Sequence, residues 1–194
     1  IPGGSCCPNG ELALRSGTSA PAPETTIVVN CAGRTRSILG AQTLIDFGIP
    51  NPVYALENGT QGWFLAGLEL ENGATRRGDA NTPDDLAARQ KQARDFTAAY
   101  QIPVISRSNL LDHIDDRDRT LYVFDVRTAE EYAEDGVAGT VHAPGGQLVQ
   151  ATDQWVGVRN ARIVVLDDDG VRAPLVANWL RRMGHDAMLL EGGI

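Results

Sequence analysis

The sequence predicts an α/β protein with an open parallel sheet flanked by helices, present in two tandem, incomplete copies. Two short apolar runs rich in β-branched residues, 27–29 and 163–166, are typical of strands buried in a parallel sheet. The segment 37–47 follows the first run and carries apolar residues at helical spacing. This pattern indicates a helix soon after the strand, as in an α/β fold.

The chain repeats itself on the scale of a structural unit. Gly48 lies 17 residues after Cys31, and Gly184 lies 17 residues after Asp167. Self-similarity of this kind indicates two copies of one unit. The other matching pairs are Ile27–Val29 with Ile163–Val165, Arg36 with Arg172, Ser37 with Ala173, Leu56–Gly59 with Leu190–Gly193, and Pro2–Gly4 with Pro144–Gly146.

A connecting helix is predicted between the repeated segments. A capping residue, a proline and two acidic residues within 81–85 are typical helix start signals, and apolar residues follow on one face to about Tyr100. The segment 102–105 then opens the second half, and a short helix begins at Ser108. The expected parts are a first unit at 1–78, a linker helix at 79–101 and a second unit at 102–194.

Cys31 is the strongest candidate for a catalytic residue. It lies between the predicted strand and the predicted helix, at the carboxyl end of a strand, where open α/β sheets bind ligands. The loop amides, the helix N-terminus and the side chains of Arg34 and Arg36 all favour an anion there. The same field lowers the pKa of a thiol and populates the reactive thiolate. The alternative is an inert buried cysteine.

The spacing between the cysteine and the arginine of the loop indicates which reaction the loop supports. The anion-binding loop of a phosphatase or arsenate reductase has five residues between its cysteine and its arginine. Here only four residues separate Cys31 from Arg36, and Ser37 stands where that arginine would be. A shorter loop suits a single transferred sulfur better than a whole phosphate group. The stretch Cys31-Ala-Gly-Arg-Thr-Arg-Ser37 resembles the Cys-x-x-x-x-Arg-Ser loop of the rhodanese family of sulfurtransferases. The segment 56–63 is similar to the family's Leu-x-Gly-Gly-x-x-x-Trp segment, with Asn58 in place of the first glycine.

The resemblance implies sulfur transfer in two steps, without a cofactor or metal. The Cys31 thiolate is expected to take the outer sulfur of a small anionic donor such as thiosulfate and to hold it as a persulfide. Cyanide or a thiol then accepts the sulfur. Ser37 is expected to cap the helix and to donate a hydrogen bond to the sulfur. The residues expected to bind donor and persulfide are Ala32, Gly33, Arg34, Thr35, Arg36 and Ser37.

The resemblance also indicates that the first unit is incomplete. A rhodanese unit begins with a strand and an Asp-Val-Arg segment, here 121–127, followed by a helix that starts at Thr128. Nothing before residues 27–29 corresponds to these elements, and the chain ends at Ile194, just before the last expected helix. Unpaired edges of a parallel sheet are a liability. We therefore expect a missing segment or a second copy of the chain to complete the sheet.

The second unit is expected to be catalytically silent. Asp167 stands where the first unit has Cys31, and a carboxylate cannot carry a sulfane sulfur. Asp168 and Asp169 add a repulsive field for an anionic donor. The three carboxylates are expected to face solvent, and a divalent metal site is the less favoured alternative.

Other functions that use the first loop stay open. A persulfide carrier would use the same Cys31 to hand sulfur to a dedicated partner, with slow multiple turnover. A regulatory or structural rhodanese-like module would be insensitive to Cys31→Ser.

Composition excludes further classes. The 194 residues carry a net charge of −8 with a pI near 4.8 and no basic stripe, so neither nucleic acid nor an anionic membrane is an expected partner. No apolar run approaches the roughly 20 residues that span a bilayer.

Cys6 and Cys7 are adjacent and are expected to have no role in the reaction, rather than to form a redox pair or to supply a resolving thiol. Three cysteines without a disulfide framework suit a reducing compartment, and we expect a cytoplasmic protein.

Overall fold

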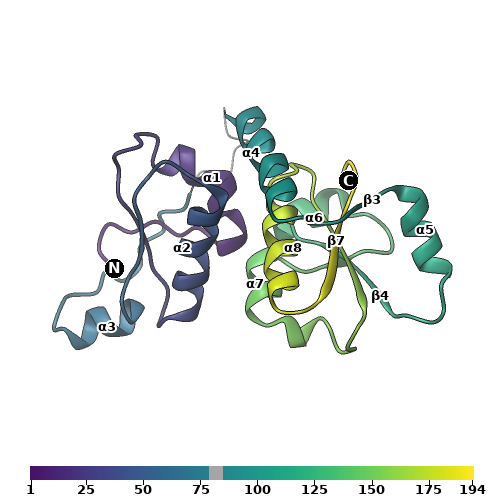
Figure 1. The fold of residues 1–194 in the computed structure, drawn as a ribbon. Helices are drawn as coiled ribbons and strands as arrows, with labels where there is room; N and C mark the ends of the chain where they lie inside the picture. Colours follow the sequence, from purple (N-terminus) through teal and green to yellow (C-terminus); the bar gives the residue numbers. More distant parts are fainter. Residues whose placement is uncertain (79–84) are drawn as a thin grey trace. The chain divides into compact units, whose positions relative to one another are not determined.

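A computed structural model describes residues 1–78 and 85–194, which form two compact units, Ile1–Leu86 and Ala87–Ile194 (Figure 1). The helix predicted to run to about Tyr100 is present as α4 (Leu86–Ala99), and nearly all of it belongs to the second unit. The start signals assigned to residues 81–84 lie outside the described residues.

The first unit is built around a two-stranded parallel sheet. Its α2 helix packs on both strands, and α1 packs on α2. Leu44 and Phe47 of α2 are buried because the apolar positions of this helix recur at helical spacing on one face. The elements are η1 (Asn9–Glu11), α1 (Leu12–Ser19), β1 (Ile27–Val29), α2 (Thr35–Phe47), β2 (Val53–Ala55) and α3 (Gly59–Leu65).

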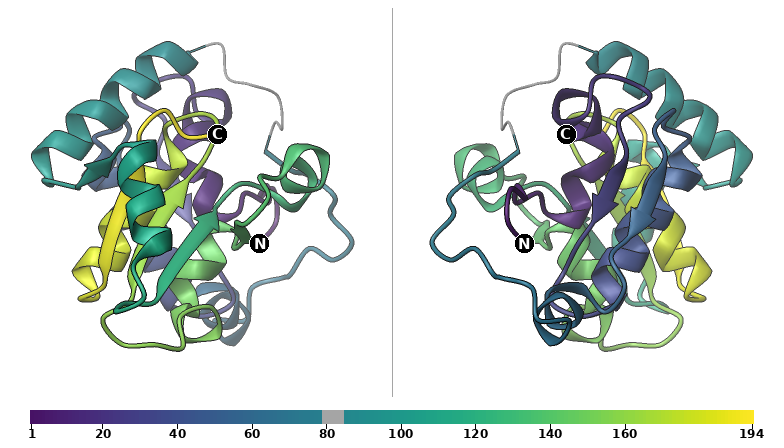
Figure 2. Two further views of the ribbon diagram at one scale, coloured as in Figure 1. Left: turned by 90° about the vertical axis from the view of Figure 1, so that its right-hand side faces the viewer. Right: turned by 90° about the vertical axis from the view of Figure 1, so that its left-hand side faces the viewer.

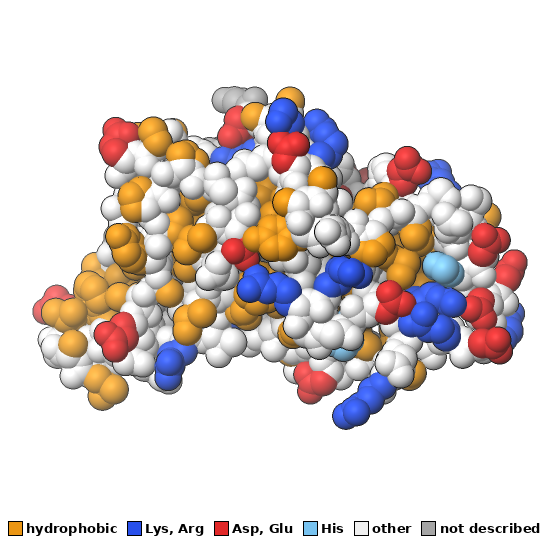
Figure 3. All heavy atoms as spheres, in the orientation of Figure 1, with side chains coloured by type: hydrophobic (Ala, Val, Ile, Leu, Met, Phe, Trp, Pro, Cys, Tyr) orange, Lys and Arg blue, Asp and Glu red, His pale blue; other side chains and the backbone are white. Residues whose placement is uncertain are grey.

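One face of the β1–β2 sheet is open. Val28 pairs with Tyr54 across the sheet, and their side chains are 53% and 62% exposed. Val29 points to the opposite face and is buried. The prediction of a buried strand is therefore right for one face of β1 and wrong for the other. Figure 3 shows hydrophobic side chains gathered over the first unit.

The second unit contains a five-stranded sheet in the order β3-β7-β6-β4-β5, with every pair parallel, which confirms the predicted sheet type. In Figures 1 and 2, α5 lies on one face of this sheet and α7 and α8 on the other. The elements after α4 are β3 (Val104–Ile105), α5 (Arg107–Asp115), β4 (Leu121–Asp125), α6 (Ala129–Asp135), β5 (Val141–His142), α7 (Gly145–Gln150), η2 (Thr152–Gln154), β6 (Arg162–Leu166), α8 (Arg172–Arg182) and β7 (Asp186–Leu190).

Local sequence explains the main elements of this unit. Strand β6 lies between β4 and β7, and its residues 163–166 are buried, as its unbroken apolar run predicts. Helix α6 starts with a capping box, in which the Thr128 hydroxyl accepts from the Glu131 amide and the Glu131 carboxylate accepts from the Thr128 amide. The helix predicted to begin at Thr128 is thereby confirmed.

The two units share several backbone details. Gly48 and Gly184 close α2 and α8 with φ values of 83° and 89°. Gly59 and Gly193 have φ values of 58° and 63°. These left-handed conformations favour glycine at all four positions. The proposed match of Pro2–Gly4 with Pro144–Gly146 is weaker, because Pro144 directly precedes α7 while no helix follows Pro2–Gly4 before Asn9.

Candidate active site

Cys31 lies in the loop between β1 and α2, at the carboxyl end of its strand, as predicted. Helix α2 begins at Thr35, and its N-cap residue, Arg34, provides no side-chain cap. The expectation that Ser37 caps this helix is therefore wrong. Ser37 lies within the first turn, and its hydroxyl donates to the Arg34 carbonyl at 2.9 Å.

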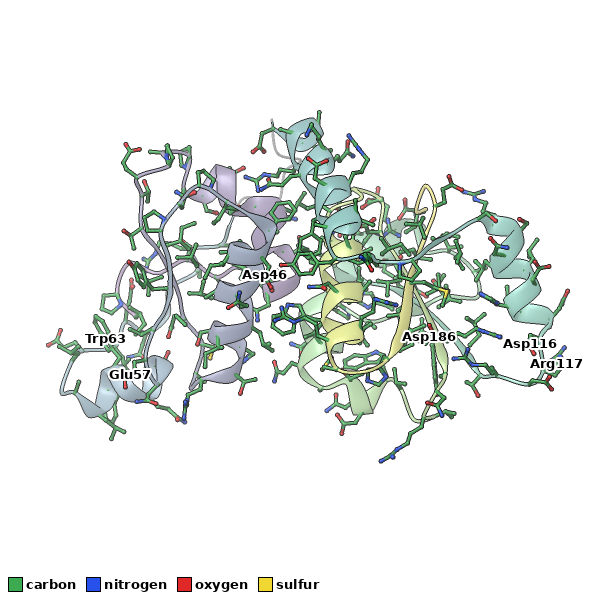
Figure 4. All side chains as sticks on the ribbon, viewed as in Figure 1. Asp46, Glu57, Trp63, Asp116, Arg117 and Asp186 are labelled. Atoms are coloured by element: carbon green, nitrogen blue, oxygen red, sulfur yellow. The ribbon has the colours of Figure 1, made fainter. Side chains whose placement is uncertain are left out.

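Backbone amides in the first turn of α3 bind carbonyl groups of the Cys31 loop. The Thr60 amide donates to the Cys31 carbonyl at 2.8 Å, and the Gln61 amide donates to the Ala32 carbonyl at 3.0 Å. The Asn30 side chain adds a hydrogen bond to the Thr60 hydroxyl at 3.2 Å. Because the loop carbonyls point at α3, the loop amides are turned toward the sulfur. Glu57 and Trp63, labelled in Figure 4, lie at this helix.

Gly59 makes this contact sterically feasible. A Cβ atom at position 59 would lie 2.3 Å from the Cys31 carbonyl oxygen and 2.5 Å from that of Gly33. The preceding Asn58 also has a left-handed backbone, with φ of 54°. Asparagine tolerates this conformation better than most residues, which explains how Asn58 replaces the glycine of the related segment.

Sequence reasoning did not identify Thr60 and Gln61 as part of the site. Their contribution comes from backbone amides, which leave no side-chain signature. The neighbouring Gly59, which has a left-handed backbone conformation, is the one residue whose type could have indicated this close contact.

The environment of Cys31 favours the thiolate. Burial raises the pKa of Cys31. This effect is outweighed by hydrogen bonds from the Ser37 hydroxyl, the Ser37 amide and the Gly33 amide and by the charge of Arg36, all of which lower the pKa. The net pKa lies below the ordinary value of a thiol. The sulfur is 3.4 Å from the Ser37 oxygen, and Ser37 is fully buried. A thiolate only accepts hydrogen bonds, so the Ser37 hydroxyl must turn from the Arg34 carbonyl toward the sulfur when the thiol ionises.

Both loop arginines, Arg34 and Arg36, have exposed side chains. The charge of Arg36 is among the main causes that lower the pKa of Cys31. The Asn9 side chain donates to the Arg36 carbonyl at 2.7 Å and fixes this part of the loop. Ala32 and Thr35 have exposed side chains as well. The loop thus brings together the sulfur, one cationic side chain and several backbone donors.

We expect Ser37→Ala to raise the pKa of Cys31, because the variant loses the hydroxyl that stabilises the thiolate. The pH dependence of Cys31 alkylation by iodoacetamide measures this shift. Thr43→Ala is the matched control, since the Thr43 hydroxyl belongs to the same helix and bonds the Leu39 carbonyl instead. Equal alkylation profiles for the two variants would contradict the assignment.

The corresponding loop of the second unit has two buried carboxylates and one exposed carboxylate. Asp167 and Asp169 are only 3% and 8% exposed, so the expectation that the carboxylates face solvent is wrong for these two residues. It is right for Asp168, whose side chain is exposed. Their oxygens accept backbone hydrogen bonds, including 3.0 Å from the Gly170 amide to Asp167 and 2.7 Å from the Val171 amide to Asp169. Within residues 1–78 and 85–194, no group of three or more potential ligands could hold a metal ion.

Asp167 makes folding sensitive to pH. Burial and the neighbouring Asp169 charge raise its pKa from 3.8 to about 7. Between these values the folded chain binds a proton that the unfolded chain does not, so we expect stability to fall as pH rises through this range. Urea unfolding at pH 5 and pH 7.5 measures the change. In Asp167→Asn the decrease should be smaller, and an equal decrease would rule out Asp167 as its source.

Cys6 and Cys7 are free thiols, as is Cys31. The Cys6 backbone pairs with the segment 76–78, accepting from the Gly78 amide at 2.9 Å. Burial and the Glu11 charge raise the pKa of Cys7 to about 11, which keeps this thiol protonated at neutral pH.

None of the described helices is long and apolar enough to cross a membrane.

Comparisons with known proteins show which proteins this chain is similar to. Residues 106–194 match the family model for a rhodanese-like domain. Thiosulfate sulfurtransferase from Pseudomonas aeruginosa is similar to 99% of the chain at 49% identity, with a TM-score of 0.95, and the chain spans 37% of that protein. A rhodanese-related protein from Thermoplasma volcanium matches 47% of the chain and 85% of its own length at 22% identity, with a TM-score of 0.40. The 3-mercaptopyruvate sulfotransferase SseA from Escherichia coli matches 89% of the chain and 67% of its own length at 20% identity, with a TM-score of 0.38. No curated protein matches the chain.

Proposed function

The chain belongs to the rhodanese-like family, and we propose that it is a sulfurtransferase that moves sulfur from thiosulfate or a similar anionic donor to cyanide or a thiol through a persulfide on Cys31. The observation that carries the proposal is the Cys31 thiol, half-exposed in an amide-lined loop that lowers its pKa. Because the chain spans 37% of the Pseudomonas protein, the activity, donor and acceptors are proposals for this chain.

The first step is nucleophilic attack. The Cys31 thiolate forms a bond to the outer sulfur of thiosulfate, the sulfur–sulfur bond of the donor breaks, and sulfite leaves with the electron pair. The Ser37 and Gly33 amides, which already bond the sulfur of Cys31, support the negative charge of the persulfide. The exposed Arg36 side chain is available to orient the anionic donor.

The second step regenerates the thiolate. Cyanide or a thiolate attacks the outer sulfur of the persulfide, and the Cys31 sulfur leaves as a thiolate. The same amides then stabilise the leaving group, so one loop serves both half-reactions. Neither step requires a cofactor or metal.

Intact mass after brief exposure to thiosulfate tests the proposal. We expect a gain of one sulfur atom that cyanide removes, with no gain in Cys31→Ser. Cys7→Ser is the matched control, because the raised pKa of the Cys7 thiol opposes attack on the donor. Sulfur uptake by Cys31→Ser, or no uptake by the unsubstituted chain, would overturn the proposal.

A persulfide carrier is the second candidate. Its support is the exposed apolar end of α3, where Phe64 and Leu65 are 63% and 83% exposed on the helix whose first turn binds the Cys31 loop. Such a surface suits a protein acceptor. A carrier would take up one sulfur but turn over slowly with cyanide, whereas an enzyme would turn over repeatedly. A regulatory module would not depend on Cys31 at all.

We further propose that the two units are tandem copies of one fold. Equivalent backbone hydrogen bonds support this, since Thr60 donates to Cys31 as Ile194 donates to Asp167. Among the described residues the first sheet has two strands, and its Val28–Tyr54 face is exposed. Both observations support a missing segment or a second copy of the chain that completes and covers this sheet. The bounds 1–78, 79–101 and 102–194 and a cytoplasmic location stay predictions, the latter supported by three free thiols.

A further inference from the structure

We propose that Asn9 is a positioning residue for sulfur transfer, because its side chain holds the oxygen of the peptide group whose N–H binds the Cys31 sulfur. This peptide group joins Arg36 to Ser37. The inference rests on the proposed function, since the residue acts on the proposed nucleophile. Asn9 itself lies in η1, outside the loop and outside the residues expected to bind donor and persulfide.

The peptide group between Arg36 and Ser37 is bound at both ends. The Asn9 Nδ2 atom donates to its carbonyl oxygen at 2.7 Å, and its N–H donates to the sulfur of Cys31. Because a peptide group is planar, fixing its oxygen also fixes the direction of its N–H. A hydrogen bond to the oxygen also polarises the group and makes the N–H a stronger donor. Asn9 therefore acts on Cys31 through one rigid group.

Asn9 reaches the loop from a packed part of the chain. It begins η1, where the Glu11 amide donates to the Pro8 carbonyl at 2.9 Å. A buried ion pair, with 2.8 Å between Glu11 and Arg15, joins η1 to α1, and α1 packs on α2. A side chain on a fixed backbone loses less conformational entropy when it forms a hydrogen bond than one on a mobile backbone. The segment before α1 is therefore suited to hold the loop.

Gly40 leaves room for Asn9 against α2. A Cβ atom at position 40 would lie 2.7 Å from the Asn9 Oδ1 atom and 2.8 Å from Leu12 Cδ1. Glycine inside a helix is destabilising relative to alanine, and the approach of Asn9 is a physical reason for it here. By the spacing that matches the two loops, Val176 corresponds to Gly40, and its side chain packs against Gly145. The unit without a thiol thus fills with a side chain the position that is left open for Asn9 in the unit with Cys31.

The test is the pH dependence of Cys31 alkylation by iodoacetamide in Asn9→Ala, read at Cys31 by peptide mass. We expect the pKa of Cys31 to rise by about half a unit, which leaves up to roughly threefold less thiolate at neutral pH. The substitution changes no charge, so the effect of Arg36 on this pKa is retained. Single-turnover uptake of sulfur from thiosulfate should fall by a similar factor at neutral pH and recover in alkaline solution.

Asn51→Ala is the matched control. The Asn51 side chain also binds backbone carbonyls of the first unit, those of Ala22 at 2.9 Å and Thr25 at 3.0 Å, but these precede β1 and do not belong to the Cys31 loop. This variant should melt at a lower temperature with the Cys31 pKa unchanged. Equal pKa shifts in the two variants, or no shift in folded Asn9→Ala, overturn the inference.

Gly40→Ala tests the same hydrogen bond if Asn9→Ala does not fold. Its methyl group meets Asn9 Oδ1 and must displace this side chain from the Arg36 carbonyl. We expect the Cys31 pKa to rise here too, and an unchanged pKa overturns the inference. Alkylation needs no sulfur donor, so these results are independent of the proposed function. Failure of the unsubstituted chain to take up sulfur would overturn that function instead.

Discussion

Gly59→Ala is expected to reduce sulfur uptake at Cys31 by roughly 100-fold or more, the cost of displacing reacting groups by about 1 Å. A methyl group at position 59 would lie 2.3 Å from the Cys31 carbonyl oxygen, 2.5 Å from that of Gly33 and 2.9 Å from the Gly33 nitrogen. All three atoms belong to the backbone, so no flexible side chain can move aside. The loop must therefore shift away from α3, and its amides shift with it. Single-turnover uptake of sulfur from thiosulfate measures the effect.

Gly67→Ala is the control that distinguishes the steric clash at position 59 from the strain of placing alanine in a left-handed backbone conformation. Gly67 has a similarly left-handed φ of 76°, but a Cβ there would have nothing within 4 Å. This variant should lose about 1 kcal/mol of stability and keep its sulfur uptake. Gly193→Ala makes the equivalent clash with the Asp167 carbonyl and should destabilise the second unit only. Normal uptake by Gly59→Ala would show that α3 does not position the loop.

Arg127→Met is expected to lower the free energy of unfolding of the second unit by about 3–5 kcal/mol. Arg127 and Asp125 are both almost completely buried, and the guanidinium donates to both Asp125 oxygens, with distances of 2.9–3.1 Å. Removing the cation leaves the buried Asp125 carboxylate without its main partner. The cost of that uncompensated charge far exceeds that of a lost surface ion pair. Urea unfolding followed by circular dichroism measures the loss.

Two further variants test this explanation. Lys91→Met removes the exposed ion pair with Asp95 and should change stability by no more than about 0.5 kcal/mol. Arg127→Met combined with Asp125→Leu should recover much of the stability lost in the single variant, because the buried carboxylate is removed with its partner. The other two carboxylates that Arg127 binds, Asp135 and Asp168, are exposed to solvent. If the double variant is as unstable as Arg127→Met, lost packing rather than the buried charge is responsible.

The position of Cys31 was predictable because it depends on residues next to it in the chain. The β-branched run 27–29 predicts a strand, the apolar spacing after Ser37 predicts a helix, and the cysteine lies between them. Both elements are present as β1 and α2. The sheet type of the second unit was predictable from a local pattern too, because the unbroken apolar run 163–166 is typical of a strand buried in a parallel sheet.

The acidic loop was not predictable from its own residues. Three consecutive carboxylates are ordinarily solvated, yet Asp167 and Asp169 are buried. Their burial depends on loop amides that converge on the carboxylates and on Arg172, which is held in turn by Glu131 from α6. Whether a carboxylate faces water or protein donors depends on how distant segments fold around it.

The sequence by itself determined the strand–loop–helix units and the residue types of the two loops, because local propensity and spacing are properties of neighbouring residues. Only the tertiary structure decided where each loop directs its amides. In both loops a backbone amide from a distant segment, Thr60 or Ile194, binds the carbonyl of the first loop residue, and amides of the loop bind the Cys31 sulfur or the Asp167 carboxylate. Hydrogen bonds between backbone groups far apart in the chain help to set this loop geometry, and they leave no pattern in the sequence.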